Sequence, residues 1–116
     1  MRKDPLLFIE DILDSIRAIR AYTKGLTREA FQTNLEKQDA VHRRLEIIGE
    51  AANRLEPDFK THHCHIPWAQ IIGMRNLLIH GYDQINLDLV WETVMRDLPI
   101  LEGKIFALLE SPPDKG

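Results

Sequence analysis

The chain has too little cysteine for a disulfide framework and no apolar run long enough to cross a membrane. Its 116 residues include one cysteine, Cys64, which excludes an internal disulfide and favours a reducing compartment. No uncharged stretch approaches the roughly 20 apolar residues that a membrane helix needs. The segment MRKDPLLFIEDILDSIR carries charges every few positions, unlike the apolar core of a signal peptide. We therefore expect a cytoplasmic protein that does not bind membranes.

Aromatic residues and excess charge are also scarce. Aromatic residues make up 7% of the chain and charged residues 28%, with a formal net charge of −3. This balance is typical of compact helical proteins rather than β-sandwiches or disordered segments. The net charge argues against a protein that holds long duplexes by phosphate neutralisation alone, although local RNA binding stays open. We interpret the basic cluster of His42, Arg43 and Arg44, with Arg54 and Arg75 further on, as part of a solvated helix face.

Several motifs that carry chemistry in other proteins are missing. The chain has no glycine-rich phosphate loop and no nucleophile motif. His62, His63, Cys64 and His65 are potential zinc ligands. However, adjacent residues in a loop cannot easily close a tetrahedron, and the usual separated ligand pairs are absent. We therefore expect no metal and no cofactor.

Helical periodicity dominates what the sequence does contain. Asp4 can cap a helix that begins at Pro5, continues to about Lys24 and stops at Gly25 in a left-handed turn. TREAFQTN, from Thr27, predicts a short helix of weak period. A longer helix is predicted over residues 39–55. Gly49 lies inside it, which indicates either tolerance or a close approach by another helix.

The second half of the chain shows the same pattern with more interruptions. Residues 56–67 are predicted as a loop because a proline stands near each end. A helix is expected from Pro67 to His80, closed by Gly81, and another over residues 87–110 that kinks or divides at Pro99. Trp68 and Trp91 stand at core spacing and are interpreted as packing residues rather than base-stacking platforms.

These elements predict the fold class. Four principal helices and a short one, joined by short connections, favour an all-α, antiparallel up-and-down bundle. Nothing in the sequence repeats or has low complexity, so residues 1–116 are expected to form a single domain.

The segment RNLLIHGY, Arg75 to Tyr82, places an arginine and a histidine five positions apart near a predicted helix end. On an ideal helix Arg75 and His80 would be separated by about 140°. They can therefore meet only if the helix ends near His80, as Gly81 suggests. An ordinary helix ending would use the same residues: Tyr82 would pack on Leu77, and Arg75 would be exposed or salt-bridged. Asn76 would then be a solvated polar position.

The segment also resembles a known family. An arginine, a polar residue and a histidine, here Arg75, Asn76 and His80, followed by Tyr82, are similar to the motif of the HEPN superfamily and of its HepT toxin branch in particular. Three flanking stretches are similar to the usual HepT pattern and extend the resemblance over most of the chain: IIGEAANRLEPDF, IPWAQIIGMRNLLIHGY and NLDLVWETVMRDLPILE.

The resemblance implies a metal-independent endoribonuclease that needs no cofactor. The ribose 2′-hydroxyl of the RNA substrate would attack the adjacent phosphorus and give a cyclic phosphate. His80 would be the general acid or base, Arg75 would hold the phosphate oxygens, and Asn76 would support the arginine or the phosphate. A 2′-hydroxyl nucleophile predicts that DNA is not cut.

The resemblance also implies partners. A homodimer would bring two copies of Arg75 and His80 to one composite site. An MNT-type nucleotidyltransferase antitoxin would transfer AMP to Tyr82 and silence the toxin, as one half of a type II or type VII-like toxin–antitoxin pair. The alternative is a non-catalytic helical docking subunit for such a nucleotidyltransferase.

Overall fold

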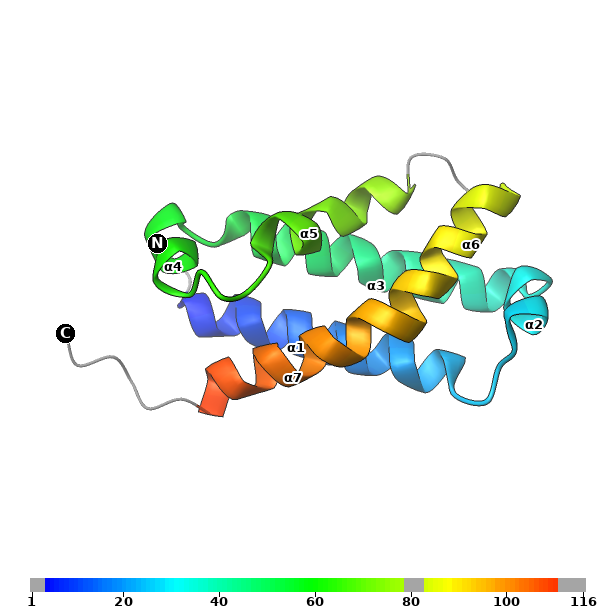
Figure 1. The fold of residues 1–116 in the computed structure, drawn as a ribbon, viewed down its shortest axis with the longest axis horizontal. Helices are drawn as coiled ribbons and strands as arrows, with labels where there is room; N and C mark the ends of the chain where they lie inside the picture. Colours follow the sequence, from blue (N-terminus) through cyan, green and yellow to red (C-terminus); the bar gives the residue numbers. More distant parts are fainter. Residues whose placement is uncertain (1–3, 79–82, 111–116) are drawn as a thin grey trace.

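Two long helices, α1 (Pro5–Thr23) and α3 (Leu35–Arg54), lie side by side along the length of the bundle (Figure 1). The structure is a computed structural model that describes residues 4–78 and 83–110. An Asp4 side-chain oxygen accepts from the Leu6 amide at 2.9 Å, and Gly25 turns the chain with a φ of 78°. The predicted start, end and left-handed turn of the first helix are therefore confirmed.

Helix α3 begins earlier than its periodicity predicted. The side chain of Asn34 caps it by accepting from the Lys37 amide at 3.0 Å, so the helix starts at Leu35 rather than near Asp39. The predicted short helix is present as α2 (Arg28–Gln32), and the Thr27 side chain caps it by accepting from the Ala30 amide. Phe31 anchors α2: its side chain is fully buried, and its ring lies 5.4 Å from that of Trp91, measured between centroids.

A second short helix, α4 (Pro57–His62), occupies the segment predicted to be a loop. That prediction was wrong because Pro57 lies in the first helical turn, where a missing N–H costs nothing and the fixed φ favours a helix start. The indole N–H of Trp68 donates to the carbonyls of Lys60 and His63, both at 3.1 Å. These bonds tie the end of α4 to the start of the next helix.

The helix that follows is not a single α-helix. Its α-helical part, α5 (Trp68–Gly73), continues as the 3₁₀ segment η1 (Met74–Leu78). Pro67 is the residue that precedes the helix. The predicted end at His80 and Gly81 lies outside the described residues.

The last helical stretch divides where proline predicted a break. It consists of α6 (Gln84–Glu92), the π-helical segment η2 (Thr93–Asp97) and α7 (Leu98–Glu110). The Leu98 amide donates to the Thr93 carbonyl, five residues back. Pro99 has no N–H with which to bond the Met95 carbonyl, so the regular ladder is interrupted here.

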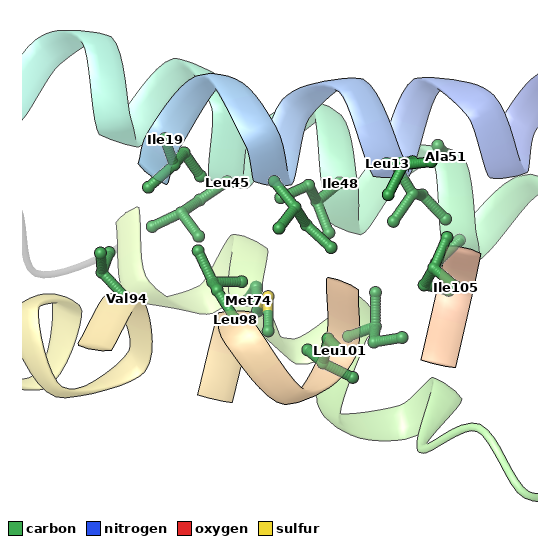
Figure 2. Packing of buried hydrophobic residues seen from close by; sticks show 14 of the residues in the cluster. Leu13, Ile19, Leu45, Ile48, Ala51, Met74, Val94, Leu98, Leu101 and Ile105 are labelled. Carbon is green, nitrogen blue, oxygen red and sulfur yellow. The ribbon is translucent and has the colours of Figure 1, made fainter. Parts of the chain in front are cut away.

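The core lies between α1, α3, η1 and α7, whose apolar side chains point toward a common interior (Figure 2). The apolar faces of α1 and α3 are buried along their length, and Trp68 and Trp91 are each 8% exposed, which confirms their packing role. Every regular element of residues 4–78 and 83–110 is helical, so the predicted all-α class is confirmed. In that part of the chain no helix is both long and apolar enough for a membrane span.

Candidate active site

Arg75 lies in η1, against the middle of α3. Its side chain is half-buried, and its stem crosses α3 at Gly49. A Cβ placed on Gly49 would stand 2.1 Å from the Arg75 Cγ and 3.0 Å from its Cδ. The close approach that Gly49 indicated in the sequence is therefore present, and the partner is the predicted phosphate-binding residue.

Arg75 has no carboxylate partner in the part of the chain that the structure describes. Within residues 4–78 and 83–110, no carboxylate forms an ion pair with its guanidinium. The alternative of a fully exposed or salt-bridged arginine therefore does not describe this side chain. A half-buried guanidinium without a carboxylate partner can bind an oxyanion, since its fork of N–H donors suits phosphate oxygens.

Two of the four predicted site residues are placed by the structure, and two are not. Asn76 follows Arg75 in η1 and is exposed, while Leu77 is partly buried against the core. His80 and Tyr82 lie outside the described residues. The same applies to the alternative in which Tyr82 packs on Leu77. The structure therefore places Arg75 and Asn76, which are consecutive residues of η1. The roles of the histidine and the tyrosine stay predictions.

A hollow of about 220 Å³ lies beside η1, lined by Gln70, Gly73, Met74, Leu77, Thr93 and Asp97. Its lining includes the acidic Asp97 and does not include Arg75. The Thr93 hydroxyl is engaged, because it donates to the Leu89 carbonyl at 2.9 Å. A carboxylate repels a phosphodiester, so this hollow is a poor phosphate site. Arg75 packs instead on α3, at Gly49.

His42 is a buried titratable residue, although the sequence predicted that it would be solvated. It was assigned to a solvated face, but its side chain is only 8% exposed. Burial lowers the pKa of His42, and the nearby carboxylate of Asp39 opposes that shift. The spacing contained the signal, because His42 precedes Leu45 and Gly49 on one face of α3. The solvated interpretation is correct for Arg43, which is exposed and pairs with Glu46 at 2.8 Å.

The histidine cluster after α4 is a set of ring contacts. The ring of His63 lies 4.6 Å from that of Phe59 and 5.1 Å from that of His62, between centroids. Among the residues that the structure describes, no three or more His, Cys, Asp or Glu side chains are arranged to hold a metal ion. Cys64 is an exposed free thiol. That the protein works without a metal stays a prediction.

An all-helical bundle whose sequence carries Arg75 five residues before His80 agrees with the resemblance to the HEPN superfamily. Residues 12–107 match the family described as "Ribonuclease HepT-like". The chain belongs to this HepT-like ribonuclease family.

Its relatives carry ribonuclease names. The chain is 39% identical over 104 residues to "Probable ribonuclease HepT" of Thermococcus cleftensis, covering 90% of this chain and 94% of that protein. It is 36% identical over 108 residues to "Putative RNase TTE0752" of Caldanaerobacter subterraneus, covering 93% and 96%.

A third relative is longer than this chain. The chain is 44% identical over 110 residues to "Gamma-glutamylcyclotransferase and putative RNase MJ0434" of Methanocaldococcus jannaschii. The match covers 95% of this chain and spans 50% of that protein. No solved structure matches the chain.

Proposed function

We propose that this protein is a metal-independent endoribonuclease in which Arg75 and His80 act on one phosphodiester. The observation that carries the proposal is Arg75, a half-buried residue that has no carboxylate partner among the described residues and stands five positions before His80. The range that matches the HepT-like family, residues 12–107, spans both positions, and the relatives' ribonuclease names support a ribonuclease activity.

The proposed reaction is an internal transfer at phosphorus. The 2′-hydroxyl oxygen bonds to phosphorus while its proton passes to a base, and the bond to the 5′-oxygen breaks as that oxygen takes a proton. The products are a 2′,3′-cyclic phosphate and a 5′-hydroxyl end. Arg75 stabilises the charge that builds on the phosphate oxygens, and His80 transfers a proton near neutral pH. Asn76, exposed beside Arg75, holds the phosphate or the guanidinium.

The reaction gains from both a base and an acid, whereas one chain offers one motif histidine. We propose that a two-fold homodimer supplies the second, with Arg75 and His80 of both subunits facing one cleft. Gel filtration with light scattering should then show a dimer. Mixing wild-type chains with an excess of His80→Ala chains should lower the activity per wild-type chain, because each mixed dimer retains only one of the two histidines. Fully active monomers would contradict the composite site.

We further propose that the protein is the cytoplasmic toxin of a toxin–antitoxin pair of type II or type VII-like organisation. An MNT-type nucleotidyltransferase would transfer AMP to the hydroxyl of Tyr82. The added phosphate is anionic and would stand two residues from His80, where it repels the RNA backbone. Mass spectrometry after incubation with the partner and ATP should show one AMP on Tyr82 and none on a Tyr82→Phe chain. An unmodified Tyr82 would contradict this regulation.

The activity itself is tested by cleavage of RNA in EDTA. Wild type should cut, and Arg75→Ala and His80→Ala should each lose at least about 100-fold in rate while keeping their helical circular dichroism. Arg43→Ala is the matched control, since Arg43 is an exposed arginine paired with Glu46, and it should cut normally. A substrate with 2′-deoxyribose at the scissile position should stay intact. Pure, dimeric wild type that cuts no RNA would favour the docking-subunit alternative.

A further inference from the structure

Gly49 is the one described glycine whose missing side chain leaves space that another residue occupies. A Cβ on it would meet the Arg75 Cγ at 2.1 Å and the backbone carbonyl of Ile72 at 3.1 Å. Gly73 and Gly103 have open space at the corresponding point, with no atom within 4 Å. Gly25 is needed for a different reason, because its φ of 78° lies in the left-handed region that favours glycine.

The backbone of α3 does not explain why a glycine stands at this position. Gly49 lies inside a 20-residue helix, and among the described residues only Gly25 has a positive φ. Glycine weakens a helix interior relative to alanine. The close approach of Arg75 and of the Ile72 carbonyl is therefore the structural reason that a residue without a side chain is needed.

We propose that Gly49 is a positioning residue for Arg75. Because Gly49 has no side chain, α3 has a notch at this position, and the aliphatic stem of Arg75 lies in the notch. The position of the stem is therefore fixed, and this limits where the guanidinium can lie. The inference rests on the proposed function, in which that guanidinium binds the scissile phosphate.

A notch of this kind matters because arginine has a long and flexible stem. Holding the stem restricts its rotamers before substrate binds, so less conformational entropy is lost when the phosphate is bound. Displacing a catalytic group by about 1 Å can cost on the order of 100-fold in rate. A methyl group at position 49 would force such a displacement, since the Ile72 carbonyl belongs to the backbone and yields less readily than the arginine side chain.

The first test is kinetic. Gly49→Ala should lower kcat about 10- to 100-fold with KM changed by less than about threefold, because Arg75 remains present but is misplaced for the transition state. Gly73→Ala and Gly103→Ala are matched controls with open space, and both should keep wild-type kcat. A Gly49→Ala protein with wild-type kcat would overturn the proposal.

The second test needs no RNA. Gly49→Ala should change the melting temperature differently in the wild-type and Arg75→Ala backgrounds, because the clash with Cγ exists only when arginine is present. We expect the change to be more favourable by several degrees in the Arg75→Ala background. Equal changes in both backgrounds would overturn the notch, whatever the activity. Unequal changes in a protein that cuts no RNA would sustain the notch and overturn the proposed function instead.

Discussion

The two halves of the bundle differ in how regular their helices are. In the first half, α1 and α3 are long, continuous and capped by Asp4 and Asn34, and their apolar faces are buried along their length. In the second half the hydrogen-bonding register changes twice, to 3₁₀ at Met74–Leu78 and to π at Thr93–Asp97. The regular helices α1 and α3 form a platform, and the irregular half contains the candidate active-site residues.

The difference shows how a small helical protein can hold a reactive group in place. Segments of 3₁₀ and π-helix have poorer hydrogen-bond geometry than α-helix, so they need support from packing. Arg75 comes from the 3₁₀ segment, but its stem lies on regular α3 at Gly49. Arg75 belongs to an irregular 3₁₀ segment and is thus positioned by a regular α-helix, α3.

The largest effect on stability should come from truncating the platform. Ile48 is fully buried on α3, next to Gly49. Ile48→Ala should lower the free energy of unfolding by about 2–5 kcal/mol, since it removes apolar contacts and leaves a cavity. Urea unfolding followed by circular dichroism measures this. Leu35→Ala, at a position on the same helix that is 59% exposed, should change it by less than about 0.5 kcal/mol. Equal losses at the two positions would contradict the comparison.

A smaller effect is expected where the irregular half is tied together. Trp68→Phe keeps most of the apolar ring but removes the N–H that donates to the carbonyls of Lys60 and His63. We expect a loss of about 1–2 kcal/mol in the free energy of unfolding. Amide exchange in α4 should also become faster, because these bonds hold its end. Unchanged unfolding together with unchanged exchange would show that α4 is held by other contacts.

The buried histidine of the platform should make stability depend on pH. Burial lowers the pKa of His42 in the folded state. The protein therefore keeps its full stability above the unfolded pKa of about 6.5. It loses stability as pH falls below that value, because the unfolded state binds the proton more readily. Between pH 7.5 and 5, His42→Gln should therefore lose less stability than wild type. Asp39→Asn should lose more, since Asp39 favours the protonated form. Identical pH slopes in all three proteins would refute the assignment.

The smallest effect is expected on the outer face of the platform. Arg43 pairs with Glu46 at 2.8 Å, but its side chain is 66% exposed. An exposed ion pair on a helix contributes little, so Arg43→Ala should change the free energy of unfolding by less than about 0.5 kcal/mol. Thermal unfolding at low and high salt measures this. A loss above 1 kcal/mol would mean that this face is covered by another molecule in the folded protein.

Local signals in the sequence predicted most of the fold. The cap at Asp4, the turn at Gly25 and the division at Pro99 are confirmed because each depends on a residue's own backbone chemistry. Helix α4 was missed because Pro57 was taken as a breaker, although proline in a first turn begins a helix. The change from α5 to 3₁₀ at Met74 has no cap or proline that announces it in the sequence.

The candidate site was predictable as residue types but not as an arrangement. The spacing of Arg75, Asn76 and His80 named the group of residues, yet the support of Arg75 depends on α3, a separate helix. The burial of His42 depends in the same way on what packs over its face. Periodicity identifies which face of a helix is covered, but it does not identify the covering residue.

The sequence by itself determined the helical class, the ends of α1, the division near Pro99 and the motif that names the family. Each of these is set within a few turns of one helix, by capping, by side-chain period or by proline. Only the tertiary structure decided that Arg75 lies over Gly49 and that His42 is buried. These facts depend on which helices meet and at what distance, and that outcome is set by the packing of the whole chain.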